Sequence, residues 1–243
     1  MAAQPTGCFI MKLIKPSVEI LKIDDINLIE LAGRTCYKSE DKITKDSAKT
    51  FVGNLIKNGH EAMIEHAAAS AKVVCDRGIA HEIVRHRHFS FAQESTRYCN
   101  YSKDKFDKSV TFIIPLWIDI AEGIYTESPV VGKFPSPRGG GVADGVAVRL
   151  NGQSENPSLI WFDSMLSAEK NYFELLAQGW VAQQARSVLP NSLKTEIVIT
   201  GNFREWRHFF KLRCAQDAHP QMREIAGMII SEFEKLQPEM IWK

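Results

Sequence analysis

Residues 85–98 read RHRHFSFAQESTRY, an Arg-His-Arg triplet at Arg85 to Arg87 that is followed after seven residues by Ser95. This stretch holds the densest cluster of polar side chains in the chain. A basic run on a helix is most often a solvated face. Several guanidinium groups held together are also typical of sites that bind phosphates or planar polar rings. The surrounding sequence has to decide between these two interpretations.

The segment that leads into this stretch has the periodicity of a helix over 77–88, with Ile79 and Ile83 on one side. At about 100° per residue, Arg87 falls on the same side as these apolar residues. A solvated face does not account for that position. We therefore expect Arg87 to point inward and Arg85 to face another way.

The same helix superficially resembles the zinc-binding helix of metalloproteases, in which two histidines at i and i+4 bind one ion. Here His81 and His86 are five residues apart, so at about 100° per residue their side chains diverge by roughly 140°. The five cysteines are widely spaced and form no CxxC pair, which argues against a cysteine-rich zinc site and a disulfide framework. We expect no metal site.

A second polar feature lies in a predicted helix over 204–213. Its basic residues form one stripe at helical spacing: Arg204, Arg207, His208 and Lys211. Its large apolar residues form the opposite face: Trp206, Phe209 and Phe210. Arg213 falls within that apolar face. Because an unpaired buried charge costs several kcal/mol or more, Arg213 needs either a structural carboxylate or a bound anion.

A third arginine, Arg186, lies near the end of a short predicted helix before Pro190. Together the arginines suggest bidentate recognition of phosphate and of planar polar rings, which fits a nucleotide. The chain contains neither a GxGxxG motif after a strand nor a GxxxxGK[ST] motif. A Rossmann dinucleotide site and a P-loop are therefore not indicated.

Hydrophobic periodicity along the chain predicts an α+β fold. The predicted strands are 11–23 with an interruption at Pro16, 67–75, 110–115 and 195–200. The other predicted helices run from Asp25 to about Tyr37 and over 44–57, 156–178, 181–188 and 221–236. The segment 128–157 is rich in glycine and proline and reads as a loop or insertion. No internal repeat is visible, so we predict one domain.

Charge is almost balanced, with 30 basic and 29 acidic side chains. The chain lacks the excess positive charge that drives binding to nucleic acid. No apolar run approaches the roughly 18 residues of a membrane span, and residues 1–7 show no export signal. With cysteines that read as reduced thiols, these features predict a cytoplasmic protein that binds neither nucleic acid nor membrane.

Several stretches resemble the flavin-dependent thymidylate synthases, and they occur in the same order as in that family: NGHEAMIEH around His60; Arg85 to Arg87 with Ser95, Arg97 and Tyr98; ARSVLP around Arg186; TGNFREWRHFFKLR ending at Arg213; and AHPQMREIA around His219. The resemblance covers nearly all of the chain from Met11 onward, apart from a segment near 135–145. No cysteine follows a proline, unlike the nucleophile of the folate-only thymidylate synthases. This difference favours the flavin-dependent family.

The resemblance implies an α+β domain over 11–243, with a central, mostly antiparallel sheet flanked by helices. It also implies a homotetramer whose active sites combine several subunits. The implied activity is reductive methylation of dUMP to dTMP by a methyltransferase, with methylenetetrahydrofolate as the carbon source, NADPH as the reductant and bound FAD as the hydride carrier.

The resemblance also implies the residues of the site. The implied flavin contacts are His60, Arg85, His86, Arg87, Gln93, Asn202, Arg204, His208 and His219. The implied nucleotide contacts are Glu82, Arg85, Gln93, Glu94, Ser95, Thr96, Arg97, Arg186 and Arg213. By resemblance Arg213 is the catalytic residue, near the uracil ring, where a guanidinium favours the ionised N3 and so enriches electron density at C5.

Three positions qualify this carry-over. Ser95 is not expected to be a nucleophile, because the sequence identifies no His-Asp pair to activate it. Glu82 stands where other members often have glutamine, and it would either contact the nucleotide or pair with an arginine. His219 lies two residues farther from Arg213 than in some members.

Two other functions stay open. The first is a nucleotide-binding or nucleic-acid-binding module in which the arginines bind phosphates without redox chemistry; the balanced charge argues against a polynucleotide ligand. The second is a flavoprotein reductase of another kind. A bound flavin and NADPH oxidation that depends on dUMP would distinguish the synthase from both.

Overall fold

The computed structural model describes residues 10–126 and 156–242. The predicted insertion at 128–157 lies outside these ranges except for its end, where a helix starts. The chain divides into two compact units. The first unit contains the chain up to Pro16, Asp76–Gly78 and Glu94–Thr195, and the second contains Ser17–Cys75, Ile79–Gln93 and Glu196–Lys243.

A three-stranded sheet forms the centre of the first unit, in the order β5-β1-β6. Strand β1 (Ile10–Ile14) is parallel to β5 (Thr111–Ile113) and antiparallel to β6 (Gly123–Thr126). Short helices follow at η3 (Asp104–Phe106), α5 (Ala182–Ala185) and η4 (Arg186–Val188). The chain thus places Arg186 at the start of a 3-10 turn.

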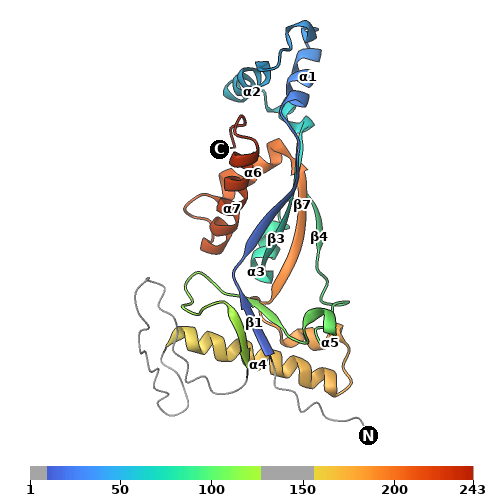
Figure 1. Cartoon of the computed structure of the whole chain (residues 1–243), viewed down its shortest axis with the longest axis vertical. Helices are drawn as coiled ribbons and strands as arrows, with labels where there is room; N and C mark the ends of the chain where they lie inside the picture. The colour runs from blue at the N-terminus through green and yellow to red at the C-terminus, as the bar shows by residue number, and fades with distance from the viewer. Residues whose placement is uncertain (1–9, 127–155, 243) are drawn as a thin grey trace. The chain divides into compact units, whose positions relative to one another are not determined.

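The long helix α4 (Pro157–Ala177) packs against β1 in this unit (Figure 1). It begins where Asn156 accepts a hydrogen bond from the Ser158 amide at 2.9 Å, and a proline occupies its first turn. Both features favour a helix start. Its apolar face, including Phe162 and Tyr172, forms one core with the buried face of β1.

A carboxyl group lies inside this core. Glu169 of α4 is fully buried, and its Oε1 accepts a hydrogen bond from the Val110 amide at 2.8 Å. Its Oε2 has no hydrogen-bond partner among the residues that the structure describes. Burial raises the pKa of Glu169 to about 7, although the Val110 hydrogen bond opposes the shift. The protonated form is therefore the one that the fold prefers.

This burial predicts a pH-dependent stability. A carboxyl whose pKa is higher in the folded than in the unfolded state stabilises the fold below the unfolded value, and this contribution is lost as the pH rises towards 7. Glutamine keeps the Val110 contact without ionising. We expect Glu169→Gln to be about 1–2 kcal/mol more stable than the wild type at pH 8.5, and the difference to shrink at pH 5. Urea unfolding at both pH values measures this, and an equal difference at both would contradict it.

A four-stranded sheet forms the centre of the second unit, in the order β2-β3-β7-β4. Strand β2 (Ser17–Ile23) is antiparallel to β3 (Ala68–Asp76), and β4 (Ser90–Gln93) is antiparallel to β7 (Lys194–Asn202). Alternate residues of β3 and β7 are buried, as expected for strands with one face in a core. The predicted interruption at Pro16 is confirmed, and it separates strands that belong to different sheets.

Helices and aromatic side chains complete the second unit. Helices α1 (Asn27–Thr35) and α2 (Ser47–Lys57) form a pair, α3 is Arg77–Ile83, and two 3-10 turns are η1 (Glu40–Lys42) and η2 (Glu61–His66). Helices α6 (Phe203–Arg213) and α7 (Pro220–Leu236) lie side by side, and α7 packs against β2 (Figure 1). Trp206 and Trp242 are buried in the core that these helices share with the sheet.

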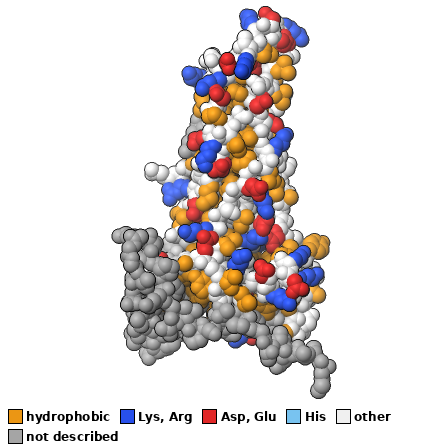
Figure 2. Space-filling view, in the orientation of Figure 1, with side chains coloured by type: hydrophobic (Ala, Val, Ile, Leu, Met, Phe, Trp, Pro, Cys, Tyr) orange, Lys and Arg blue, Asp and Glu red, His pale blue; other side chains and the backbone are white. Residues whose placement is uncertain are grey.

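The predicted α+β fold with a mostly antiparallel sheet is confirmed, and the structure adds a second, mixed sheet. The extent of the domain, 11–243, stays a prediction. None of the helices in the described ranges combines the length and apolar composition needed to cross a bilayer. Acidic and basic side chains are mixed over the visible face of the described residues in Figure 2, in keeping with the balanced charge.

Candidate functional site

The basic stripe of α6 lines a groove in the second unit. Its volume is about 900 Å³, and it is lined by Glu61, Glu65, His88, Asn202, Arg204, Glu205, Arg207, His208 and Lys211. The predicted division of α6 is confirmed, because Trp206, Phe209 and Phe210 are buried. One apolar face thus fixes the helix in the core and leaves its basic stripe facing the groove.

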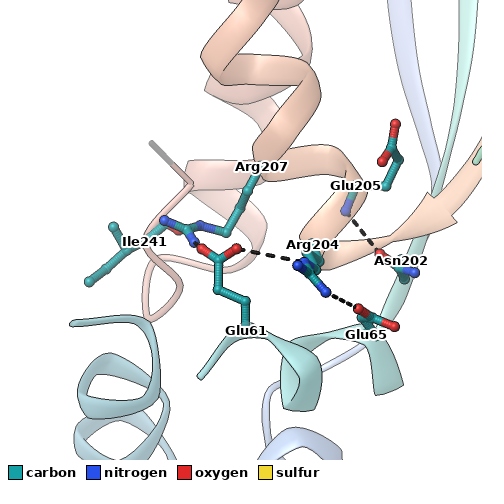
Figure 3. Close-up of polar contacts among 7 residues, drawn as sticks. All are labelled: Glu61, Glu65, Asn202, Arg204, Glu205, Arg207 and Ile241. Carbon is teal, nitrogen blue, oxygen red and sulfur yellow. Dashed lines mark hydrogen bonds and ion pairs between the residues drawn. The ribbon is translucent and has the colours of Figure 1, made fainter. Parts of the chain in front are cut away.

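Carboxylates of η2 hold two of these guanidinium groups (Figure 3). Arg204 donates to Glu65 Oε1 at 2.6 Å, and its Nε lies 3.7 Å from Glu61 Oε2. Arg207 donates to Glu61 and to the Ile241 carbonyl. By contrast, Lys211 is exposed and forms no ion pair with any residue that the structure describes. The groove therefore combines fixed guanidinium groups with one free ammonium group.

Asn202 starts α6 at the edge of this groove. Its backbone is extended, and its side-chain oxygen accepts a hydrogen bond from the Glu205 amide at 2.9 Å (Figure 3). This is the cap that the first turn of a helix needs. The side-chain amide nitrogen of Asn202 remains to donate to a ligand.

The Arg-His-Arg triplet lies in a turn beyond the end of α3. The helix ends at Ile83, and the Val84 amide still bonds four residues back, to the Ala80 carbonyl. The next two amides bond three residues back, Arg85 to the Glu82 carbonyl at 3.2 Å and His86 to the Ile83 carbonyl at 3.1 Å. His86 is 7% exposed, whereas Arg85 and Arg87 are exposed. The prediction that Arg87 points inward is wrong, because the helical angle on which it rests no longer applies beyond Ile83.

A smaller cavity of about 270 Å³ adjoins this turn. It is lined by Arg85, His86, Arg87, His88, Glu205, His208, Leu212 and Arg213. Neither Arg85 nor Arg87 has an ion-pair partner within 10–126 or 156–242. The turn after α3 and the end of α6 therefore bring several predicted flavin and nucleotide contacts to one place.

Arg213, at the end of α6, meets the turn directly. Its Nε donates to His86 Nε2 at 2.9 Å, while its terminal nitrogens donate to Glu82 Oε2 at 3.1 Å and to the Glu82 carbonyl at 3.3 Å. Its side chain is 21% exposed and that of Glu82 is 37% exposed. The sequence predicts that Arg213 pairs with either a structural carboxylate or a bound anion, and the structure shows the carboxylate of Glu82. The expectation that Glu82 pairs with an arginine is confirmed.

The environment of His86 keeps its imidazole neutral. Burial lowers the pKa of His86 to about 4, with further contributions from the charges of Arg213 and His208. Its Nδ1 lies 3.7 Å from Glu205 Oε1, and its ring packs edge-on against Phe209 at 5.0 Å between centroids. At neutral pH His86 can therefore accept a hydrogen bond from a cation.

Other predicted nucleotide contacts lie in the first unit. Glu94 accepts hydrogen bonds from Lys194 at 3.0 Å and from the Tyr101 hydroxyl at 3.1 Å. Thr96 is buried, and its hydroxyl accepts from Arg186 at 2.9 Å. Within this unit the structure thus joins Thr96 of the RHRHFSFAQESTRY stretch to Arg186.

Two more residues of this stretch follow Glu94. Within the described ranges, Ser95 Oγ accepts only a long contact, from the Arg97 amide at 3.4 Å. Arg97 is exposed, with its guanidinium over the Tyr98 ring at 5.4 Å. Nothing about Ser95 resembles an activated nucleophile, which needs an adjacent base.

Three predicted flavin contacts are not among the residues that line the two cavities. His60 and His219 are exposed residues just before η2 and α7, and Gln93 ends β4. Conversely, the sequence interpretation did not include Glu61, Glu65, His88, Glu205 and Lys211 among the site residues, although they line the groove. Two glutamates four residues apart, in the same stretch as His60, were a usable signal for partners of the basic stripe.

Comparison with known proteins gives consistent matches across both units. A family model described as "Thymidylate synthase complementing protein" matches residues 20–239. Proteins named "Flavin-dependent thymidylate synthase" match as well. The one from Corynebacterium aurimucosum is 31% identical over 219 residues, which cover 87% of this chain and 76% of that protein. The one from Corynebacterium efficiens is 32% identical over 219 residues, which cover 76% of its length. The one from Mycolicibacterium vanbaalenii is 31% identical over 216 residues, which cover 77% of its length.

Proposed function

The chain belongs to the flavin-dependent thymidylate synthase family, and from this premise we propose that it converts dUMP to dTMP with FAD as its flavin. Methylenetetrahydrofolate is the proposed carbon source and NADPH the proposed reductant. The family makes the protein an enzyme, a methyltransferase that uses a flavin. The observation that carries this proposal is the contact of Arg213 with the triplet turn, beside the groove that the basic stripe of α6 lines.

The groove fits a flavin nucleotide in its chemistry. A dinucleotide carries phosphate charges and a planar polar ring, which guanidinium and amide donors bind well. Arg204, His208 and the free amide of Asn202 line the groove, and Arg85 and Arg87 line the adjoining cavity without ion-pair partners among the described residues. We assign these residues, with His86, to the flavin; Gln93, His60 and His219 are further proposed contacts. When bound, FAD would supply the hydride that completes the new methyl group.

The proposed nucleotide contacts include Glu82, Arg85 and Arg213 around the triplet turn, and Gln93 at the end of β4. The other proposed contacts are Glu94, Ser95, Thr96, Arg97 and Arg186. Arg97 and Arg186 supply charges suited to a phosphate, and the fixed carboxylate of Glu94 suits a sugar hydroxyl donor.

Activation of the substrate is electrostatic in this proposal. A guanidinium beside the uracil ring stabilises the ionised N3, which raises electron density at C5, the carbon that attacks the methylene group. Arg213 is the proposed catalytic residue because its guanidinium is held at the wall of the cavity. No enzyme nucleophile is required, and Ser95 is assigned to binding alone.

We propose that the enzyme works as a homotetramer in the cytoplasm and takes small molecules as its only substrates. Exposed leucines of the second unit, Leu21, Leu28 and Leu31, support contacts between copies of the chain. The free thiols of Cys36 and Cys99 agree with a reducing compartment.

Purified protein tests the function. We expect a yellow protein after loading with FAD, and NADPH oxidation that rises sharply when dUMP is added, with dTMP formed in the presence of methylenetetrahydrofolate. Absorbance follows the flavin and NADPH, and chromatography measures dTMP. Protein that takes up no flavin would support a binding module instead, and NADPH oxidation of equal rate without dUMP would support a different reductase.

A further inference from the structure

Four side chains of the second unit form one continuous chain of contacts. Glu205 Oε1 lies 3.7 Å from His86 Nδ1, His86 Nε2 lies 2.9 Å from Arg213 Nε, and Arg213 Nη1 lies 3.1 Å from Glu82 Oε2. They come from α6, the turn after α3, and α3 itself. His86 lies between Glu205 and Arg213, and it is the most buried of the four side chains.

The direction of the hydrogen bond fixes the tautomer of His86. Arg213 Nε carries one hydrogen and no lone pair at any ordinary pH, so it can only donate. His86 Nε2 must therefore be the unprotonated nitrogen, and the ring proton lies on Nδ1, facing the Glu205 carboxylate. The charges that face His86 are Arg213, His208 and Glu205, all from α6, and Glu82 reaches it only through Arg213.

The same contacts restrict Arg213. A guanidinium has five N–H groups, and three of them are used: one by His86 and two by Glu82. Two donors remain, one on each terminal nitrogen. The His86 contact fixes the Nε edge of the guanidinium, and without it Glu82 alone would set the direction of these donors.

We propose that His86 is the positioning residue of Arg213, holding the guanidinium through its Nε so that the two remaining donors face the pyrimidine ring of the nucleotide. This inference rests on the role proposed for Arg213 and assigns His86 a task distinct from flavin contact. The negative charge of Glu205, 3.7 Å from Nδ1, favours a ring proton on that side of the imidazole.

Matched substitutions at His86 separate the acceptor from the bulk of the ring. Glutamine can place its oxygen near the position of Nε2, whereas leucine fills a similar volume without any acceptor. We expect His86→Leu to weaken dUMP binding, measured by calorimetry, by roughly tenfold or more, and His86→Gln to stay within about threefold of the wild type. His81→Leu, at an exposed histidine of α3 outside both cavities, is the control.

A double-mutant cycle with Arg213→Ala tests whether the effect passes through Arg213. We expect His86→Leu to have no further effect on dUMP binding once Arg213 is alanine. If Arg213→Ala alone binds and methylates dUMP normally, the proposed role of Arg213 fails. If Arg213→Ala is impaired while His86→Leu is not, or if the two effects add, only the positioning role fails. Flavin absorbance of each variant shows whether flavin is lost instead.

Nitrogen NMR of labelled histidine gives a readout that needs no turnover. Wild-type His86 is expected to show a protonated Nδ1 and an unprotonated Nε2 at neutral pH. In Arg213→Ala we expect a mixture of tautomers and an easier protonation of the ring. A wild-type spectrum with the proton on Nε2, or a spectrum that Arg213→Ala leaves unchanged, would overturn the proposal.

Discussion

An Arg213→Ala variant is expected to lose most of its dUMP methylation, with kcat/KM reduced by about 100-fold or more, because one fixed donor aimed at developing charge contributes on this scale. The fold should persist. The Arg213 side chain is already 21% exposed, and Glu82, which loses its partner, is 37% exposed and can be solvated. The expected defect is therefore one of chemistry.

Initial rates of dTMP formation, together with unfolding curves, measure this prediction. Arg213→Lys is the matched variant, because it keeps the positive charge but lacks the planar guanidinium. A lysine ammonium cannot replace the guanidinium in donating to both His86 and Glu82. We expect lysine to restore only a small part of the activity. Full activity of the alanine variant would refute the role assigned to Arg213.

A Gly201→Ala variant is expected to unfold more easily, by about 3 kcal/mol, because the added methyl group has no room. Gly201 is a buried residue of β7, and a Cβ there would overlap the ring of Phe89. That ring packs against Trp206 at 4.6 Å between centroids and lies 6.2 Å from the His86 ring. Moving Phe89 therefore disturbs the core and the triplet turn together.

Gly227→Ala is the control for this change. Gly227 lies within α7, and a Cβ there would meet nothing within 4 Å. Alanine in a helix interior is favoured over glycine by up to about 1 kcal/mol, so this variant should equal or exceed the wild type in stability. Urea unfolding of the three proteins gives the comparison, and equal midpoints for Gly201→Ala and the wild type would contradict the expected overlap.

Helix α6 shows what could be predicted from the sequence. Its apolar and basic residues repeat with the period of a helix, so the buried face and the groove face follow from spacing alone. The same holds for the need of Arg213 for an anion, because the cost of an unpaired buried charge does not depend on the partner. The partner itself, Glu82, lies 131 residues away along the chain, and no local pattern identifies it.

The turn after α3 shows where such reasoning stops. Periodicity predicts a helix to His88, yet the backbone leaves the helix after Ile83 through hydrogen bonds between residues three apart. Once the helix ends, successive side chains no longer turn by about 100° per residue. His86 is therefore the buried residue of the triplet, and Arg87 is exposed. The predicted helix is too long, and for that reason Arg87 is expected in the core in place of His86.

Strand pairing was beyond the sequence as well. Residues 11–23 look like one interrupted strand, but the parts before and after Pro16 pair in different sheets. Proline cannot donate to a strand ladder, which explains the break at that point. The partners of each part are set by contacts distant in the sequence.

The core of the second unit has a consequence for the order of events at the ribosome. Strands β2 and β3 are synthesised early, but α7, which covers β2, and the buried Trp242 follow only after all the residues of the first unit. Contacts so distant along the chain form slowly, and apolar strand faces stay uncovered until they do. The nascent chain must therefore carry an unfinished sheet through most of its synthesis, and this core can close only when translation has passed Trp242.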